Sequence, residues 1–172
     1  RQAAKVNNSS LGADRAGTSA PQSAIDAAVG RGTTVVVAAG NDNDNVANHS
    51  PGNCNNVISV AATNRTGAKA SYSNYGSLVD ISAPGGQTST GTANGILSTL
   101  NSGTKTPSSE SYAYYQGTSM ATPHIAGLVA LMKSANPSLT PAQIETAIKS
   151  NARPLPGACS GGCGAGLADA AK

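Results

Sequence analysis

The chain has 172 residues and a mass of 16.8 kDa, which is enough for one domain with a sizeable core and too little for two. Only 11% of the residues are charged, the net charge is +3, and the lysines and arginines stand apart along the chain, so a positively charged stripe is absent and we expect no nucleic-acid partner. No apolar run approaches the roughly 20 residues that span a bilayer, so we expect no membrane partner.

The first forty residues alternate extended and helical segments. Residues 7–12 are polar and extended in character, and Ser19-Ala-Pro21 predicts the start of a helix that ends at Gly30 or Gly32. Residues 33–38 then form a short β-branched run, which is typical of a buried parallel strand.

The middle of the chain combines polar loops with short apolar runs. A loop rich in Gly, Asn and Asp covers residues 40–56, and apolar strands are predicted over 57–62 and 78–82. Residues 85–111 are rich in Gly, Ser and Thr and predict surface loops and a hairpin, with Ile96-Leu97 as a brief strand.

From Gly117 onward the apolar residues take up helical spacing. They recur with Ala and Gly between them as far as Ala135, which predicts a mostly buried helix. Thr140, Pro141 and Gln143 supply an N-cap, a first helical residue and a capping-box partner, and predict a second helix. Helices interleaved with apolar strands indicate an α/β layer fold with a parallel sheet and no interdomain linker.

The three cysteines are an odd number, so they cannot all pair within the chain. Cys159 and Cys163 are separated by Ser-Gly-Gly, which allows a small disulfide loop, with free thiols as the alternative. Cys54 is left over in a polar loop, and we expect its partner to lie outside this chain. Disulfides and low charge favour a secreted protein. The chain opens at Arg1 without an initiator Met, which indicates a processed piece of a longer product.

Two segments place polar groups where chemistry is possible. Residues 35–41 are a buried strand that runs into Asn41, and ligands in α/β folds bind outside the carboxyl ends of strands. Residues 117–124 place Ser119 at the mouth of the long apolar helix, where free N–H donors favour developing negative charge. A hydroxyl, its own amide N–H and a side-chain amide directed at one point would form an oxyanion site for acyl transfer.

Both segments also have simpler interpretations. Ser119 is compatible with a helix N-cap, and Asn41 with an ordinary turn residue. The serine segment differs from the Gly-x-Ser-x-Gly turn of α/β hydrolases, because Ala121 occupies the last place; this disfavours an esterase.

A resemblance decides between these interpretations. The run Gly-Thr-Ser-Met-Ala-Thr-Pro-His-Ile-Ala-Gly over 117–127 closely resembles the serine signature of the subtilases, the family of subtilisin and proteinase K. Further segments resemble that family in the same order, so the similarity covers nearly the whole chain; they are residues 8–12, 35–41, 71–76, 80–85 and 164–167. The resemblance implies a three-layer α/β fold built on a parallel sheet.

The resemblance also implies roles for particular residues. Ser119 would be the nucleophile that attacks a peptide carbonyl, and Asn41 the side-chain donor to the oxyanion. Substrate backbone would pair with residues 8–12 by strand addition. The walls of the first specificity pocket would be small and apolar, which implies a broad preference for apolar or aromatic side chains; they are Ser10, Leu11, Gly12, Ala38, Ala39 and Gly40.

The family's catalytic Asp and His motifs, Asp-Thr/Ser-Gly and His-Gly, do not occur in this sequence. His124 lies within the serine signature and should point away from the Ser119 hydroxyl, and His49 lies in a polar loop without a family motif, so neither is expected to be the base. Residues 1–172 are therefore expected to be the C-terminal portion of one peptidase domain, inactive alone, whose partners are an N-terminal portion of the same protease and peptide or protein substrates. The alternative is a catalytically silent, subtilase-like scaffold.

Calcium is the one cofactor that the resemblance implies. Asp80 resembles an aspartate that binds calcium in proteinase K-like members, with backbone carbonyls from Asn55 and Val57. The alternative is a solvated or capping carboxylate at Asp80. The run over 42–45 is rich in Asp and Asn but lacks the Gly and distal Glu of an EF-hand, so a turn is favoured there.

Overall fold

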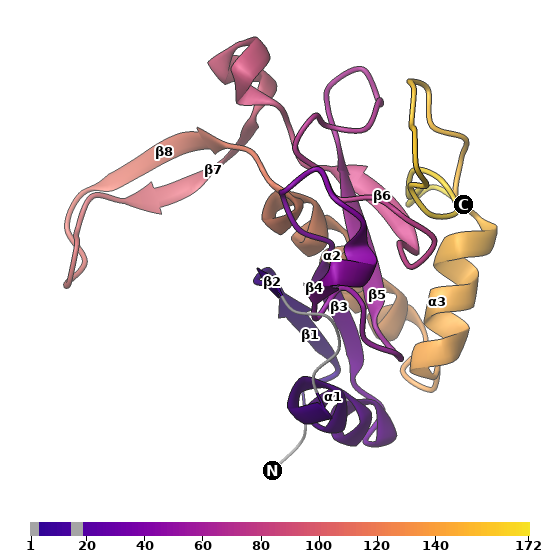
Figure 1. Cartoon of the computed structure of the whole chain (residues 1–172). Coiled ribbons are helices and arrows are strands. Elements are labelled where there is room, and N and C mark those ends of the chain that lie inside the picture. The colour runs from indigo at the N-terminus through magenta and orange to yellow at the C-terminus, as the bar shows by residue number, and fades with distance from the viewer. Residues whose placement is uncertain (1–3, 15–18) are drawn as a thin grey trace.

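The computed structural model describes residues 4–14 and 19–172. Its main sheet has four parallel strands in the order β1-β3-β5-β6 (Figure 1). The bounds of these strands are β1 Val6–Ser9, β3 Thr34–Ala38, β5 Ile58–Thr63 and β6 Ile81–Pro84. Every residue of β3 and β5 is buried, as expected for strands covered on both faces.

Helices cover both faces of the sheet, as alternate residues of β3 show. Val35 and Val37 pack with Ile25 of helix α1 (Ser19–Gly30). Val36 packs in a second cluster with residues of α2 (Thr118–Ala135) and α3 (Pro141–Ser150). Because successive side chains of a strand point to opposite faces, α1 lies on one face, and α2 and α3 on the other. The predicted three-layer α/β fold is confirmed.

Two small antiparallel pairs accompany the main sheet. Strands β2 (Ala13–Asp14) and β4 (His49–Ser50) form one pair. Strands β7 (Ile96–Asn101) and β8 (Glu110–Tyr115) form a hairpin that projects from the body of the molecule (Figure 1). Three short 3₁₀ helices complete the described elements: η1 Val46–Asn48, η2 Thr88–Thr90 and η3 Thr92–Asn94.

Three predicted segments differ from the observed elements. The strand predicted over 78–82 begins only at Ile81, because the Val79 amide donates to Gly76 O at 3.2 Å in a turn that leaves Leu78 exposed. The polar loop over 40–56 contains η1 and β4, and the hairpin strands are longer than the brief strand expected at Ile96-Leu97. Among the residues described, no helix is long and apolar enough to cross a membrane.

Helix α3 begins with the predicted capping box, and this generates a stability prediction. The Gln143 amide donates to Thr140 Oγ1 at 3.2 Å, and the Thr140 amide donates to Gln143 Oε1 at 2.9 Å. Replacing Thr140 with Ala should therefore lower the free energy of unfolding by about 1 kcal/mol, measured by urea denaturation. Thr146→Ala is the matched control, because Thr146 is exposed within the same helix, where Ala is the better helix former. Equal stability of the two variants would contradict the prediction.

Candidate active site

Helix α2 holds Ser119 in its first turn through a reciprocal contact with the segment after β1. The Ser119 Oγ donates to Ser10 O at 3.0 Å, and the Ser10 Oγ donates to Ser119 O at 3.1 Å. The Ser119 carbonyl is available for this bond because Pro123, four residues later in the helix, has no N–H to donate to it. The proline therefore allows Ser10 to fasten the start of α2 to the sheet.

Asn41 follows β3 and binds the first residue of α2. Its Oδ1 accepts from Thr118 N at 2.8 Å and from Thr118 Oγ1 at 2.9 Å, so Asn41 satisfies one of the amide groups that a helix leaves free at its N-terminus. These two bonds orient the carboxamide. Its Nδ2 has no hydrogen-bond acceptor among the described residues, and so remains available as a donor.

Gly117 lies beside two donors. A Cβ on this residue would lie 3.6 Å from Ser119 N, 3.7 Å from Asn41 Nδ2 and 3.6 Å from Met120 Sδ, all in ordinary van der Waals contact. Gly117 also has a φ of 150°, a conformation that favours glycine. The Ser119 amide, like Asn41 Nδ2, has no acceptor within the described part of the chain. An oxygen that develops negative charge near this point would therefore meet both donors.

A cavity of about 280 Å³ adjoins Ser119. It contains five of the six residues predicted as pocket walls, and the sixth, Ser10, bonds to Ser119 instead. The five are Leu11, Gly12, Ala38, Ala39 and Gly40. The structure thus brings the predicted walls, Asn41 and Ser119 together at the carboxyl ends of the strands.

Other lining residues were not predicted. Asp42, His49 and Ser50 also line the cavity, whereas the sequence places His49 only in a polar loop without a family motif. It is 7% exposed, and its ring nitrogens lie 3.5 Å from Asp42 Oδ2 and 3.1 Å from Asp44 Oδ2. These residues reach the cavity because β4 pairs with β2. Each of these strands has only two residues, which is too short to give a recognisable sequence pattern.

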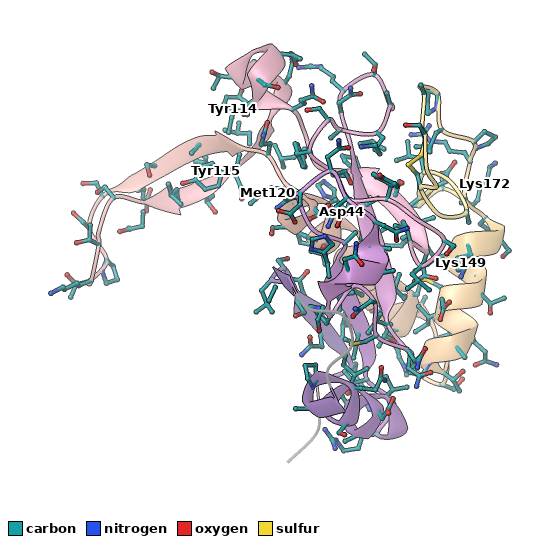
Figure 2. All side chains as sticks on the ribbon, in the orientation of Figure 1. Asp44, Tyr114, Tyr115, Met120, Lys149 and Lys172 are labelled. Atoms are coloured by element: carbon teal, nitrogen blue, oxygen red, sulfur yellow. A yellow bond between two sulfur atoms is a disulfide. The ribbon has the colours of Figure 1, made fainter. Side chains whose placement is uncertain are left out.

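Two polar residues, the buried Asn74 and the partly buried Tyr72, support the site and were likewise missed. Asn74 is fully buried; its Oδ1 accepts from the amides of Asp42 and Asp44, and its Nδ2 donates to Ala39 O at 2.9 Å. A Cβ at Gly40 would lie 2.2 Å from Asn74 Nδ2, so glycine is required there. The side chain of Asn74 therefore fixes the loop after β3 through three backbone hydrogen bonds. Asp44, which lies on this loop, is labelled in Figure 2.

Tyr72 supports the segment that leads to α2. Its hydroxyl contacts the carbonyls of Gly85 and Gly86 at 3.0 and 2.7 Å, and the Gly117 amide donates to Gly85 O at 3.0 Å. Burial raises the pKa of Tyr72 to about 12, so the phenol stays protonated and remains a donor at ordinary pH.

The simpler interpretations of Ser119 and Asn41 are wrong in their local geometry. The residue that caps α2 is Gly117, and Ser119 lies inside the helix with its side chain directed to Ser10. Asn41 bonds across 77 residues to Thr118 and not within its own turn. His124 bonds through Nδ1 to Met120 O at 2.8 Å, and in the described residues it makes no hydrogen bond to Ser119.

The predicted calcium ligands do not fit a cation in this arrangement. Both carboxylate oxygens of Asp80 are engaged: Oδ1 with Lys149 Nζ at 2.7 Å and Oδ2 with the Ser59 amide at 2.9 Å. The Asn55 carbonyl also has a partner, because it accepts from Gln22 Nε2 at 3.1 Å. In residues 4–14 and 19–172, no group of three or more His, Cys, Asp or Glu residues could hold a metal ion.

The cysteines divide as their spacing allows. Cys159 and Cys163 form a disulfide in the structure. Cys54 is a free thiol, partly buried against the cluster that α1 forms with β3. Its expected partner outside the chain stays a prediction.

Comparisons with known proteins agree with this geometry. The family model described as "Subtilase family" matches residues 1–166. The chain is 60% identical over 168 residues to an "Extracellular protease" of Xanthomonas campestris, covering 97% of this chain and 28% of that protein. It is 39% identical to "Thermitase" of Thermoactinomyces vulgaris, covering 91% of this chain and 49% of that protein.

A solved structure titled "Proteases from Pseudoalteromonas arctica PAMC 21717" superposes with a TM-score of 0.93 at 54% identity, covering 97% of this chain and 49% of that one. The chain thus spans half or less of the length of these relatives.

The contact between Asp80 and Lys149 generates a pH prediction. The Asp80 carboxylate raises the pKa of Lys149 above its ordinary value, more than partial burial lowers it. The folded protein therefore holds this proton more tightly than the unfolded chain, so the stabilisation is complete below about pH 10.4 and is lost as the pH rises through the raised pKa. Lys149→Met should lower the melting temperature at pH 8 and remove this loss at alkaline pH, measured by thermal denaturation across pH.

The same variant tests the calcium site. Lys149, which projects from α3 in Figure 2, places an ammonium where a cation at Asp80 would bind. We therefore expect that calcium does not bind at Asp80 in the native protein. The change in melting temperature on adding calcium or a chelator should be the same in the native protein and in Asp80→Asn. Lys149→Met frees Asp80, and calcium should then raise the melting temperature of this variant further than that of the native protein. A calcium response in the native protein that Asp80→Asn abolishes would contradict this expectation.

Proposed function

Because this chain belongs to the subtilase family, we propose that it carries the serine part of a serine endopeptidase active site, with Ser119 as the nucleophile. The observation that carries this proposal is the closeness of Ser119 N and Asn41 Nδ2, which both lie within 3.7 Å of the position of a Cβ on Gly117 and have no acceptor among the described residues. Two neighbouring free donors match the needs of an oxyanion during acyl transfer, and a structural helix start does not require the second donor.

The residues present account for part of the reaction. The Ser119 Oγ attacks the carbonyl carbon of the scissile peptide and forms a tetrahedral intermediate, whose oxyanion accepts hydrogen bonds from Ser119 N and Asn41 Nδ2. The intermediate expels the amine and leaves an ester on Ser119, which water then hydrolyses. A general base must take the Ser119 proton and deliver it to the leaving amine.

The base and its orienting carboxylate would come from an N-terminal portion of the same protease. In the described residues β1 forms an end of the sheet and pairs only with β3, and an unpaired strand edge readily accepts a further strand. The projecting hairpin adds apolar surface for the same partner, since Leu97, Tyr112 and Tyr115 are exposed. Alone, the chain would have no base for Ser119 and would not hydrolyse peptides.

Substrate would bind along the segment after β1. Residues 8–12 offer backbone for strand addition, and the small walls of the cavity, such as Gly12, Ala38 and Ala39, would accept apolar or aromatic side chains broadly. Secretion is part of the proposal, since two relatives are named extracellular proteases and the chain carries a disulfide. Calcium at Asp80 is not, because Lys149 holds that carboxylate.

A fluorophosphonate probe tests the nucleophile. The protein joined with its N-terminal portion should gain one phosphonyl group that peptide mapping places on Ser119, because the probe reacts with an activated serine. Intact mass spectrometry of the denatured sample, with and without reductant, measures the adduct and shows whether Cys54 links the two portions. Ser119→Ala should abolish labelling and peptide hydrolysis, and Ser89→Ala, at an exposed serine of η2, should retain both. No adduct despite a bound N-terminal portion would favour a silent scaffold.

Replacing Asn41 tests the oxyanion donor separately. Asn41→Ala should lower kcat about 10²–10³-fold with little change in KM, a magnitude taken from subtilisin, where the corresponding amide has been removed. The reason is that the donor acts mainly on the charge of the transition state. Asn55→Ala is the matched control, since Asn55 is an exposed asparagine whose backbone, and not its side chain, bonds to Gln22. A loss confined to KM would contradict the proposed role.

A further inference from the structure

We propose that a cavity at the base of the β7–β8 hairpin binds the C-terminal residue of a polypeptide, with Arg65 as the group that recognises its carboxylate. This hairpin cavity lies between the loop after β5, the η2–η3 segment and the two hairpin strands. Its use for the leaving part of a substrate rests on the proposed function, whereas the binding site itself does not.

The hairpin cavity is large enough for a side chain and its backbone. Its volume is about 500 Å³, within the range of about 300–1,000 Å³ that small-ligand sites occupy. Pro84, Ala93, Ile96 and Tyr114 form its apolar walls. Tyr114 is 39% exposed there, and Figure 2 shows it at the base of the hairpin beside the η helices. An apolar side chain that fills the cavity would bury the exposed part of this ring.

The hairpin cavity carries a single positive charge. Arg65 is the one charged residue among the described residues that line it, and Arg65 makes no ion pair within residues 4–14 and 19–172. Its Nη1 donates to Ala93 O at 3.0 Å, which holds the guanidinium at the cavity wall. The remaining guanidinium donors have no acceptor in the described part of the chain. A planar guanidinium with free donors is the preferred protein partner of a carboxylate.

Two asparagines add a donor and an acceptor beside Arg65. Asn64 Oδ1 accepts from Thr66 N at 3.1 Å and from Thr66 Oγ1 at 2.8 Å, so the carboxamide is fixed and its Nδ2 has no acceptor among the described residues. Asn94 Nδ2 donates to Thr90 O at 3.1 Å, and its Oδ1 receives no donor from the described chain. Both asparagines line the cavity.

These groups together match the last residue of a polypeptide. Such a residue carries a carboxylate, a backbone N–H and a side chain on one carbon atom. Arg65 and Asn64 Nδ2 would bind the carboxylate, and Asn94 Oδ1 would accept the N–H. The side chain would pack against Tyr114. A free aromatic or fatty acid has no N–H for Asn94, and an inorganic anion has no apolar part.

The walls of the hairpin cavity are held in place without a ligand. Gln116 Oε1 accepts from Thr88 N at 2.6 Å and from Thr88 Oγ1 at 2.9 Å, which joins η2 to the end of the hairpin. The Gln87 amide donates to Asn94 O at 3.0 Å, which ties the start of η2 to the end of η3. Groups that are already fixed lose little conformational freedom when a ligand binds, and this favours binding.

A smaller cavity connects this site to Ser119. It has a volume of about 360 Å³, contains Ser119 and Met120, and shares Ile96 and Leu97 with the hairpin cavity. The cavity with the predicted pocket walls has only Ser119 in common with it, so the two lie on different sides of the nucleophile. The leaving part of a cleaved peptide runs from its new amine toward its C-terminus. Its terminal carboxylate would therefore lie in the direction of the hairpin cavity.

The first test measures binding at Arg65 itself. Isotope-labelled protein joined with its N-terminal portion would be titrated with N-acetyl-phenylalanine or its amide, and the side-chain Nε–H signals of the arginines followed by NMR. The Arg65 signal is the one lost in Arg65→Gln. It should shift with an affinity about three- to tenfold higher for the carboxylate than for the amide, as for a partly exposed charge-assisted pair. The signal of Arg153, which is exposed and outside the cavity, should not shift.

Two variants and a third ligand identify the rest of the site. Tyr114→Ser should weaken the carboxylate and the amide alike, because the ring contacts the side chain of both. Hydrocinnamate has the same ring and carboxylate as N-acetyl-phenylalanine but no N–H, so it should bind more weakly, and Asn94→Ala should remove this difference. An Arg65 signal that does not shift, or equal affinities for carboxylate and amide, overturns the site. Equal affinities for hydrocinnamate and N-acetyl-phenylalanine overturn the assignment to a polypeptide C-terminus.

The second test concerns substrate. Peptides that are identical up to the scissile bond would carry leaving parts of increasing length, each ending in phenylalanine as a carboxylate or as an amide. The carboxylate to amide ratio of kcat/KM should rise to about three to ten at one length. Arg65→Gln should return it to about one, and Arg153→Gln, which removes the same charge elsewhere, should retain it.

The outcomes separate this inference from the proposed function. A ratio of one at every length overturns the use of the site by substrate, while hydrolysis of the same peptides leaves the endopeptidase intact. If no peptide is cleaved and Ser119 takes up no fluorophosphonate, the proposed function fails, and a carboxylate-dependent shift of the Arg65 signal would still support the binding site.

Discussion

The hydrogen bonds from Thr118 to Asn41 Oδ1 are the constraint on which the site depends. They join the loop after β3 to the first residue of α2 across 77 residues of chain, at 2.8 and 2.9 Å. One carboxamide thereby caps a helix whose N-cap residue, Gly117, has no side chain to do so, and its other end is left as a donor. The local rules for helix N-termini and for oxyanion recognition are satisfied by the same side chain. This contact sets the direction of the Nδ2 donor and, together with the hydrogen bonds between Ser10 and Ser119, the position of Ser119 relative to the cavity.

Buried polar groups hold both sides of that contact. Asn74 fixes the loop through the amides of Asp42 and Asp44, and Tyr72 binds the carbonyls of Gly85 and Gly86, the first of which also accepts from the Gly117 amide before α2. On the opposite side, Pro123 withholds a helical donor and the Ser119 carbonyl accepts from Ser10 instead. Burying such groups is costly unless each finds a partner. The network is therefore specific: changing one member would leave another buried and unsatisfied.

The sequence predicts this architecture where the signal is local or carried by a long motif. The β-branched run of β3 and the capping box at Thr140 depend only on neighbouring residues, and both were predicted with their approximate bounds. The serine signature identified Ser119, and the order of the motifs identified Asn41. The missed features all rest on contacts between distant residues. Lys149 reaches Asp80 across 69 residues, and His49 enters the cavity only because β4 pairs with β2. No pattern within a window contains that information.

In the proposed enzyme, the groups that bind substrate and the groups that transfer the proton lie in different parts of the protease. The cavity, the carboxylate of Asp42 and both oxyanion donors are assembled by residues 10–13, 38–50 and 117–119, all within this chain. Under the proposed function, the base would come from an N-terminal portion of the same protease. In hydrolases of this type the oxyanion donors and substrate contacts retain a measurable part of the catalysis when the triad is removed. In the proposed enzyme the serine part is therefore physically separable from the base: it would position a peptide carbonyl and stabilise its charge, while the rate of attack would depend on a proton acceptor supplied by the N-terminal portion.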